Sequence, residues 1–364
     1  MKLILDKIIQ LAIDIQQIPA PTFAEQKRAQ FLRDLYLDEG LDNVEIDEVG
    51  NLYGRIKGDA DAAPLVICAH TDTVFPAETD LRITRDPRLV AGPGIGDNSM
   101  GVAGMIGLLW LLRDQQIKSP GDIWLVATVG EEGLGNLNGM RAVVNRFEDT
   151  PIAYLALEGM ALGHIYHRGI GVRRFRISAS TAGGHSWGNY GRPSAIHTLA
   201  KLIDELTSIN LPRKPRTTLN IGVFNGGTSV NTIAAEADFE LDLRSESLTT
   251  LTELVDTVHQ LVSSVNKPRI KVVAEPIGER PAGEIPDSHP LVKLAERALI
   301  QVGIEPLLTI SSTDANIPLS RGYPTVCLGI TTGHGAHTQK EFIDTPPIED
   351  GMRQLLYFVE NLWA

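Results

Sequence analysis

The stretch that decides the fold is residues 65–73, LVICAHTDT, in which an apolar run ends in a histidine and an aspartate. A short apolar run of this kind indicates a strand buried on both faces, as in a parallel sheet. Side chains two residues apart on a strand point the same way, so His70 and Asp72 share one face. The histidine could bind a metal ion while the aspartate fixes its tautomer, although such a pair also occurs for structural reasons.

Outside this stretch, apolar runs alternate with segments of helical periodicity. The runs lie at about residues 44–56, 122–129, 152–157 and 324–330, and the helical segments at about 3–17, 22–39, 99–114 and 349–362. Thr22 and Glu25 have the spacing of a capping box at the start of the second helix. Buried strands that alternate with helices predict an α/β fold, in which helices sandwich a mostly parallel sheet.

The pattern changes between residues 169 and 284. Strands are predicted at about 172–180, 217–224, 232–243 and 269–274, with helices at about 194–208 and 248–265. The order β-α-β-β-α-β is that of a ferredoxin-like α+β module. The stretch 275–290 is rich in proline and glycine and is typical of a return hinge. We therefore expect a discontinuous first domain, residues 1–168 and 285–364, and an inserted domain, residues 169–284.

Length and composition limit the classes of function. A chain of 364 residues exceeds the roughly 250 to 300 at which one core stops growing, which agrees with two domains. The net charge of −12 opposes binding to nucleic acid. Cys68 and Cys327 lie in apolar runs and predict no disulfide. The N-terminal segment reads as an amphipathic helix rather than a signal peptide, and no apolar run reaches the ~18 residues of a membrane span. We expect a cytoplasmic protein without a membrane partner.

Acidic residues and histidines follow several of the other predicted strands and loops. Each has an ordinary interpretation, such as a helix N-cap, a solvated pair of loop carboxylates or a loop histidine. Together they fall where the strands of an open α/β sheet end, and such sheets bind ligands there. Carboxylates and imidazoles are ligands of divalent metals, so the pattern predicts a metal-hydrolase site. Its candidate residues are His70, Asp72, Asp97, Glu131, Glu132, Glu158 and His337.

A charge count favours two ions over one. Asp97, Glu132 and Glu158 would supply about three negative charges and a bridging hydroxide a fourth, which offsets two divalent cations. His70 and His337 would then give one histidine to each ion. Adjacent carboxylates such as Glu131 and Glu132 repel each other unless a cation compensates, and one of them could serve as a base.

As an ordered set, the motifs HTDT, GDNSMG, GEEG, LEG, GGHS, NTIAAEA, DLR and HTQKE resemble the co-catalytic dizinc metallopeptidase family. That family includes glutamate carboxypeptidase, aminoacylase, carnosinase and peptidase T. The resemblance implies a zinc exopeptidase-like fold with His70, Asp97 and Glu158 on one ion and Asp97, Glu132 and His337 on the other. It also implies that Asp72 orients His70 and that Glu131 is the general base. The implied ions are Zn²⁺, with Co²⁺ or Mn²⁺ as alternatives.

The resemblance further implies a homodimer formed through the inserted domain. His185 would reach the active site of the partner subunit and stabilise the oxyanion, while Asn231 and Arg244 match positions that contact the substrate. The family often has N-V-I-P where this chain has NTIA at residues 231–234. Its dipeptidase and peptidase T branches usually have aspartate at the position of Glu158. These departures leave the substrate open.

The expected function is therefore metal-dependent hydrolysis of an amide or peptide bond in a small peptide or an N-acyl amino acid. Two other functions stay open. Residues 184–188 fit G-x-S-x-G, so Ser186 could be the nucleophile of a serine hydrolase. The chain could also be a metal-dependent binding protein without catalysis, although Glu131 would then have no use. A dinuclear phosphodiesterase is less favoured, because this acidic chain does not attract phosphate.

Overall fold

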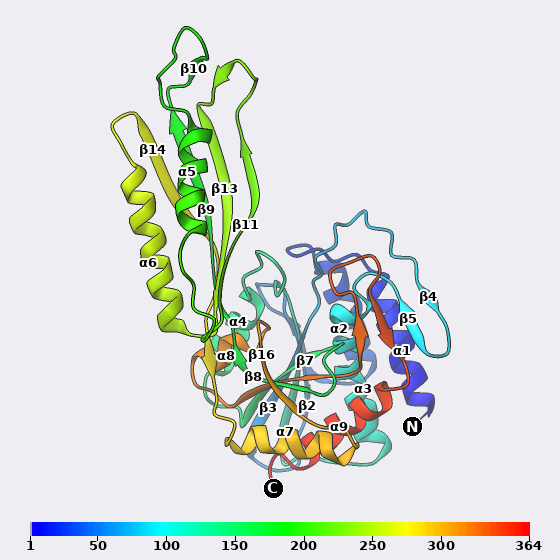
Figure 1. The fold of residues 1–364 in the computed structure, drawn as a ribbon. Coiled ribbons are helices and arrows are strands. Elements are labelled where there is room, and N and C mark those ends of the chain that lie inside the picture. The colour runs from blue at the N-terminus through cyan, green and yellow to red at the C-terminus, as the bar shows by residue number, and fades with distance from the viewer. Residues whose placement is uncertain (1) are drawn as a thin grey trace. The chain divides into compact units, whose positions relative to one another are not determined.

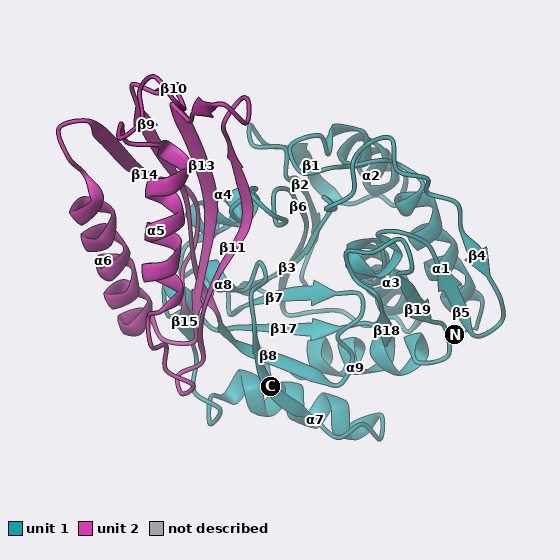
Figure 2. Ribbon diagram, turned by 45° about the horizontal axis from the view of Figure 1, so that its top comes forward, with its two compact units in different colours: residues 1–169, 283–364 teal, residues 170–282 magenta. Residues whose placement is uncertain are grey.

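The computed structural model describes residues 2–364 and divides into two compact units, which Figure 2 shows in different colours. Unit 1 consists of residues 1–169 and 283–364, and unit 2 of residues 170–282. The sequence placed these divisions at 168/169 and 284/285. Each unit has its own cluster of buried apolar side chains.

Unit 1 is built on a nine-stranded sheet with the order β1-β2-β6-β3-β7-β17-β8-β15, with β16 beside β8. The central strands β6, β3, β7 and β17 are parallel, whereas β1, β2 and β15 pair antiparallel and β8 is antiparallel to β17. The sheet is thus mixed, and the predicted parallel arrangement applies to its centre. The strands are β1 (Asp42–Ile46), β2 (Leu52–Ile56), β3 (Ala62–His70), β6 (Gly121–Thr128), β7 (Ala153–Glu158), β8 (His164–Gly169), β15 (Gly283–Glu284), β16 (Leu307–Ser311) and β17 (Thr325–Gly329).

Helices cover this sheet, as Figure 1 shows for α3, α7 and α9. They are α1 (Lys2–Gln16), α2 (Gln26–Asp38), α3 (Gly101–Asp114), α4 (Asn138–Phe147), α7 (Pro290–Gln301), α8 (Asn316–Ser320) and α9 (Ile348–Glu360), and a π-helical turn η1 (Ile95–Met100) precedes α3. The segment Ile95–Asp114 is long and apolar enough to cross a membrane, but 94% of its 18-residue apolar window is buried inside the protein. It is therefore the core helix of unit 1.

A small second sheet in unit 1 joins distant segments. It has the order β18-β19-β5-β4, with β4 (Thr84–Arg85), β5 (Leu89–Ala91), β18 (Gly333–His334) and β19 (Phe342–Asp344). Phe342 pairs with Ala91, so the hairpin formed by β18 and β19 lies beside the chain that leads into η1. This sheet brings the loop around residue 337 to the turn around residue 97.

The predicted strand at residues 44–56 is in fact a hairpin of β1 and β2. Asp47 ends the first strand, because its Oδ1 accepts hydrogen bonds from the main-chain N–H groups of Val49, Gly50 and Asn51. An aspartate that binds the backbone just ahead of it is typical of a turn.

Unit 2 has the order β-α-β-β-α-β that the sequence predicts. Its strands are β9 (Gly171–Thr181), β11 (Thr217–Gly226), β13 (Glu236–Ser245) and β14 (Ile270–Arg280), its helices α5 (Ala195–Thr207) and α6 (Leu248–Val265), and two short strands, β10 (Gly184–His185) and β12 (Thr232–Ile233), pair at one end. The four long strands are antiparallel in the order β11-β13-β9-β14. Both helices pack against the sheet through a common core.

The predicted hinge at residues 275–290 is wrong in its first part. Strand β14 continues to Arg280, since residues 275–280 pair with Val172–Arg176 of β9. Pro276 is accommodated because the register shifts between Pro276 and Gly278. Proline at such an irregularity does not interrupt an edge strand.

Candidate metal centre

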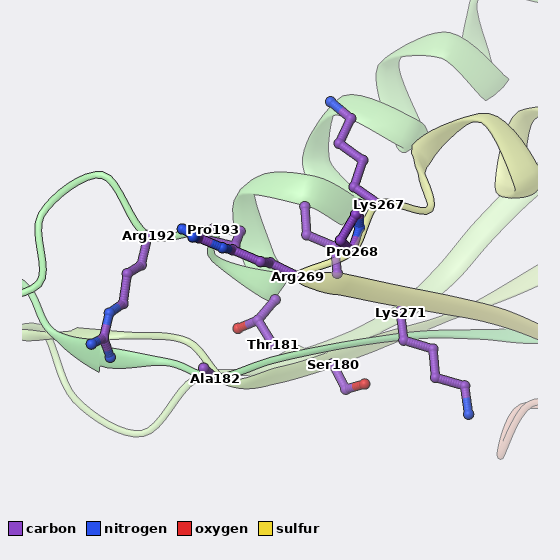
Figure 3. Close-up of a pocket in the computed structure, with 10 residues that line it drawn as sticks. Ser180, Thr181, Ala182, Arg192, Pro193, Lys267, Pro268, Arg269 and Lys271 are labelled. Atoms are coloured by element: carbon purple, nitrogen blue, oxygen red, sulfur yellow. The ribbon is translucent and has the colours of Figure 1, made fainter.

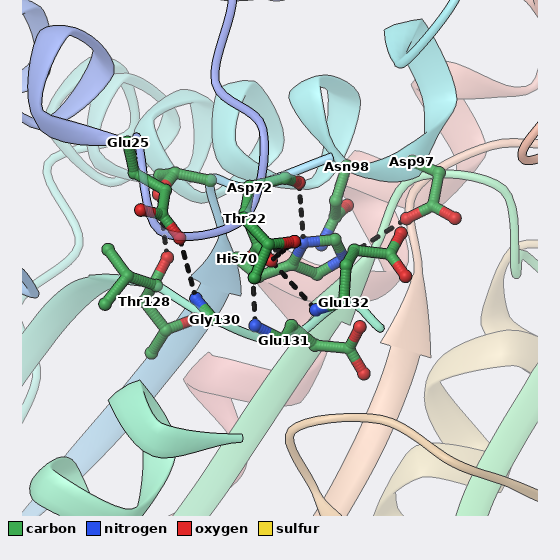
Figure 4. A network of polar contacts seen from close by, with 12 residues as sticks. Thr22, Glu25, His70, Asp72, Asp97, Asn98, Thr128, Gly130, Glu131 and Glu132 are labelled. Carbon is green, nitrogen blue, oxygen red and sulfur yellow. Dashed lines mark hydrogen bonds and ion pairs between the residues drawn. The ribbon is translucent and has the colours of Figure 1, made fainter. Parts of the chain in front are cut away.

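Five segments of unit 1 carry the predicted ligands to one edge of the large sheet. Because β6, β3 and β7 are parallel neighbours, their carboxyl ends lie together, and His70 and Glu158 are the last residues of β3 and β7. Glu132 follows β6, Asp97 lies in η1, and His337 lies in the loop between β18 and β19. Figure 4 shows His70, Asp97 and Glu132 at this edge.

The side chains of these residues approach one another closely. Asp97 lies between two histidines, with its Oδ1 3.1 Å from His70 Nε2 and its Oδ2 3.0 Å from His337 Nε2. Glu132 Oε1 is 3.1 Å from His337 Nε2, and Glu158 Oε2 is 3.9 Å from His70 Nε2. The structure thus brings together all five side chains that the sequence proposes as ligands.

These positions fit two metal ions. One oxygen or nitrogen from each of His70, Asp97 and Glu158 lies within 4.8 Å of the others, and the same holds for Asp97, Glu132 and His337. A tetrahedral ion with ligands at about 2.1 Å holds its donor atoms about 3.4 Å apart. Both sets therefore need only small movements to bind an ion each, with Asp97 in common.

Charge within the cluster also fits bound cations. Burial raises the pKa of Glu158 well above its usual value, and the nearby carboxylates of Asp97 and Glu131 raise it further. A divalent cation beside Glu158 would remove this penalty on its charged form. The chemistry of the donors, two imidazoles and three carboxylates, is that of a site for a borderline metal such as Zn²⁺.

The two histidines bind protons firmly when carboxylates alone surround them. Hydrogen bonds to Asp97 and Glu132 raise the pKa of His337 to about 10. Burial lowers the pKa of His70, but hydrogen bonds to Asp72 and Asp97 outweigh it and raise that pKa well above its usual value. At Asp97, burial raises the pKa, but the hydrogen bonds to His337 and His70 outweigh it and hold the pKa well below the usual range. Metal binding therefore competes with proton binding at these imidazoles.

Asp72 organises more of the site than the sequence suggested. Its main-chain oxygen lies 3.1 Å and its Oδ1 3.4 Å from Nδ1 of His70, as expected of a residue that orients this ring. The same carboxylate accepts the main-chain N–H of Glu131 at 3.0 Å and of Glu132 at 2.8 Å, and the hydroxyl of Thr22 at 2.9 Å. Asp72 therefore holds both a ligand and the loop that carries the expected base.

Sequence reasoning missed the role of Thr22 and Glu25. The predicted capping box is absent, because neither side chain caps α2, which begins at Gln26. Thr22 instead donates to Asp72, and Glu25 Oε1 accepts the main-chain N–H of Gly130 at 3.1 Å. The local spacing was visible in the sequence, but these long-range partners had no local signal. The turn before α2 thus supports the loop that bears Glu131.

His334 does not belong to the cluster. Its ring packs against Phe342, with ring centroids 5.8 Å apart, whereas His337 lies among the carboxylates. His337, the first residue of the HTQKE motif, is therefore the histidine of this segment that lies in the cluster.

In unit 2, the structure brings together two of the three remaining predicted residues. The pairing of β10 with β12 places His185 beside Thr232. The main-chain N–H of Ser186 donates to the main-chain carbonyl oxygen of Asn231 at 2.9 Å. Arg244 lies near the other end of β13, where its Nε donates to Asp242 Oδ1 at 2.7 Å. The residues from Glu236 to Arg244 span roughly 26 Å at about 3.3 Å per residue.

A sequence profile decides the family. The profile of peptidase family M20/M25/M40 matches residues 66–361, which is most of the chain. The chain belongs to this family. It is therefore a hydrolase that acts on peptide or amide bonds, and the predicted metallopeptidase or amidohydrolase class is confirmed. The M20 family depends on dinuclear metal sites, which agrees with the two sets of ligands described above.

Individual relatives of this M20 protein support the assignment. Acetylornithine deacetylase of Proteus mirabilis (strain HI4320) is 28% identical over 320 residues, which cover 82% of this chain and 79% of that protein. The crystal structure of aminopeptidase PepT from Bacillus cereus has the same fold, with a TM-score of 0.81, 23% identity and 99% of both chains covered. A dinuclear metal-binding M20 peptidase from Bacillus subtilis gives a TM-score of 0.71 at 15% identity, covering 99% of this chain and 98% of the other.

The serine hydrolase alternative has no support in this M20 chain. Ser186 follows the two-residue strand β10 and lies in a loop, and the next helix begins only at Ala195. A nucleophile elbow requires a sharp turn from a strand directly into a helix. Ser186 is therefore not placed as a nucleophile.

The largest cavity described in unit 2, of about 640 Å³, is a poor candidate for a substrate site. It is lined by basic residues and by Ser180, Thr181, Ala182, Pro193, Pro268 and Ile270. Figure 3 shows Lys267 and Lys271 pointing in opposite directions, while Arg192 points away from both. Small-molecule sites have polar groups that converge on the ligand, and these do not.

Proposed function

We propose that this M20 enzyme is a dinuclear exopeptidase or N-acyl-amino-acid deacylase. The proposal rests mainly on the position of Asp97. One of its carboxylate oxygens lies 3.1 Å from His70 Nε2 and the other 3.0 Å from His337 Nε2. His70, Asp97 and Glu158 would hold one ion, and Asp97, Glu132 and His337 the other, with Zn²⁺ preferred and Co²⁺ or Mn²⁺ as alternatives. When bound, the ions would polarise the scissile carbonyl and lower the pKa of an attacking water towards neutrality.

Glu131 is the general base in this proposal. Its carboxylate has an oxygen within 4.8 Å of donor atoms of His70 and Glu132, so it lies beside the proposed ions. The hydrogen bond from its main-chain N–H to Asp72 fixes its place in the loop. Glu131 accepts the proton of the attacking water and then transfers it to the leaving amine.

His185 stabilises the oxyanion that forms at the substrate carbonyl. Its Nδ1 lies 3.2 and 3.3 Å from the main-chain N–H groups of Trp187 and Gly188, and both donate to it. A ring nitrogen that accepts hydrogen bonds carries no proton, so in the neutral ring the proton is on Nε2. Nε2–H is therefore the donor that His185 presents to an oxyanion.

The separation within unit 2 supports action of His185 across a homodimer. About 26 Å separates Arg244 from the end of β13 at Glu236, and Figure 1 shows β10 beyond that end. A dipeptide spans only about 7 Å. If His185, Asn231 and Arg244 all contact one substrate, they must come from two protomers. A homodimer and a cytoplasmic location belong to the same proposal.

The substrate in this proposal is a small peptide or an N-acyl amino acid. Arg244 suits a substrate carboxylate because its planar guanidinium can bind one bidentately. In this structure its Nε and Nη2 donate to the two carboxylate oxygens of Asp242, at 2.7 and 3.4 Å. The amide oxygen of Asn231 accepts from Ser229 Oγ at 3.0 Å, which leaves its NH₂ group to donate to substrate oxygens. The names of the relatives, a deacetylase and an aminopeptidase, favour both substrate types.

A substrate panel with metal control tests the proposal. Di- and tripeptides and N-acyl amino acids are assayed with Zn²⁺, Mn²⁺ or Co²⁺, before and after chelation. We expect hydrolysis of at least one class, its loss on chelation and its return with added metal. Activity that survives complete metal removal would contradict the mechanism. If protein loaded with two ions hydrolyses none of these amides, the alternative of a metal-dependent binding protein without catalysis would be favoured instead.

A further inference from the structure

Glu341 is a buried carboxylate that the proposed mechanism does not use. It is 0% exposed and lies four residues after His337, at the start of the segment that enters β19. Its carboxylate accepts three main-chain hydrogen bonds from the turn that contains Asp97. Gly94 N–H donates to Oε2 at 2.9 Å, and Oε1 accepts from Gly96 N–H at 2.7 Å and Asp97 N–H at 2.8 Å.

The main chain of Glu341 holds the same turn from a second side. Its carbonyl oxygen accepts the N–H of Gly92 at 2.9 Å. The turn is sharp, since Gly94 has a φ of 74°, a value that favours glycine. Glu341 therefore contacts the segment 92–97 through both its backbone and its side chain, although some 245 residues separate them in the chain.

A carboxylate at this place is costly unless something specific offsets the cost. Burial disfavours a charged group, and Asp97, itself an acid, belongs to the turn that Glu341 contacts. Three N–H groups aimed at one carboxylate form a small anion-binding nest, and hydrogen bonds to a charged acceptor are about twice as strong as neutral ones. Both oxygens are used, so a neutral amide of the same shape could not replace the carboxylate without turning one acceptor into a donor.

We infer that Glu341 is a positioning residue that sets the distance between Asp97 and His337. Its carboxylate accepts the main-chain N–H of Asp97, and it lies with His337 in the loop between β18 and β19. A change at Glu341 would therefore move these two ligands relative to each other. The inference rests on the proposed function and extends it beyond the five ligands.

The two metal sites should not depend equally on Glu341. The set of Asp97, Glu132 and His337 has two members tied to Glu341, whereas the set of His70, Asp97 and Glu158 has only one. His70 and Glu158 stand at the ends of β3 and β7, which are different segments of the chain from the loop of Glu341. Loss of the contact should therefore weaken the ion on His337 more than the ion on His70.

Metal binding to Glu341→Gln tests this inference. The full-length protein is dialysed against buffered free Zn²⁺, bound metal is measured by plasma mass spectrometry, and circular dichroism checks the fold. We expect the ion on His337 to bind at least about tenfold more weakly than in wild type, which is the effect typical of losing a residue that orients a ligand. The affinity for the ion on His70 should change less. Asp47→Asn is the matched control, because Asp47 also binds three N–H groups in a turn of unit 1 outside the cluster.

The outcomes separate the inference from the proposed function. Wild-type protein that never binds two ions would overturn the proposed function. Wild-type protein with two ions and Glu341→Gln with two equally tight ions would overturn only the role of Glu341. An equal loss of metal from folded Asp47→Asn would also overturn it, since the effect would then reflect general destabilisation. If Glu341→Gln does not fold, Glu341→Asp is measured. Its shorter carboxylate should reach the N–H groups of residues 94–97 less well, so this variant should bind the ion on His337 more weakly than wild type does.

Discussion

The two units of this protein present their candidate functional residues in opposite ways. In unit 1, the proposed ligands come from strands, a turn and a loop, and neighbouring ones approach to between 3.0 and 3.9 Å. Buried neighbours such as Asp72 hold the segments that carry them. In unit 2, His185 and Asn231 lie on an exposed end, and Arg244 lies far along the sheet. The proposed metal ligands thus meet within one unit, whereas the proposed substrate contacts lie far apart along the other unit.

The exposed end of unit 2 strengthens this contrast. Trp187 is 88% exposed and Tyr190 91% exposed, and both follow His185 in the same loop. Val230, next to Asn231, is also fully exposed. Large apolar side chains gathered on an exposed end are typical of a surface that binds a partner or a ligand. This agrees with a role for that end across a dimer.

The largest effect should come from the base within the complete centre. Glu131→Ala should retain both ions but lose at least about 100-fold in kcat, because general base catalysis contributes about 10² to 10⁴. Turnover and bound metal are measured on the same sample. Glu48→Ala, on an exposed turn, is the control and should keep normal turnover. Near-normal activity of Glu131→Ala would remove Glu131 from the mechanism.

A similarly large effect should come from the exposed end of unit 2. His185→Ala should lose about 100-fold or more in kcat, as when one oxyanion donor is removed. Mixing it with Glu131→Ala under subunit exchange should restore activity, since one active site of the mixed dimer then has both residues. His197→Ala, on α5, should behave as wild type. No recovery in exchanged dimers would place His185 in its own subunit's site or outside the mechanism.

A smaller effect is expected where unit 1 supports its base loop. Thr22→Val removes the hydroxyl that donates to Asp72 and should lower metal affinity or kcat about tenfold. Thr252→Val, whose hydroxyl bonds only within α6, should change neither quantity. If Thr22→Val matches wild type in both measurements, the turn before α2 does not support the site.

The smallest effect is a pH dependence of metal binding. With its pKa raised from 6.5 to about 10, His337 is protonated at pH 7 and releases its proton when the metal binds. Metal affinity should therefore rise with pH up to about 10, and calorimetry in two buffers of different ionisation enthalpy should detect proton release. The folding stability of the metal-free protein should instead fall as the pH rises. Protonated His337 stabilises the fold fully below about pH 6.5, and this stabilisation is lost as the pH rises through about 10. Metal binding without proton release would contradict the geometry of His337.

Local patterns in the sequence predicted much of this structure. The apolar run before His70 is strand β3, and the alternating pattern after residue 169 gives the element order of unit 2. Residues at strand ends could be grouped because parallel strands end at one edge. The fold class and the five clustered side chains followed from these rules and from the ordered motifs.

The rest depended on contacts between distant residues. Thr22 and Glu25 have the spacing of a capping box, yet their side chains bind Asp72 and Gly130. Asp97 precedes α3 in the sequence, where an aspartate is often a helix N-cap. In the structure it lies inside η1 with a non-helical backbone, and its main-chain N–H donates to Glu341. Periodicity and capping rules describe neighbours along the chain, so they could not show these partners.

Anomalous X-ray diffraction from crystals of the Zn²⁺-loaded protein tests the proposed dinuclear centre most directly. We expect two zinc peaks about 3.5 to 4 Å apart, with Asp97 between them. His70 and Glu158 should bind one ion, and Glu132 and His337 the other. A single peak in fully loaded crystals, or zinc bound away from these five side chains, would contradict it.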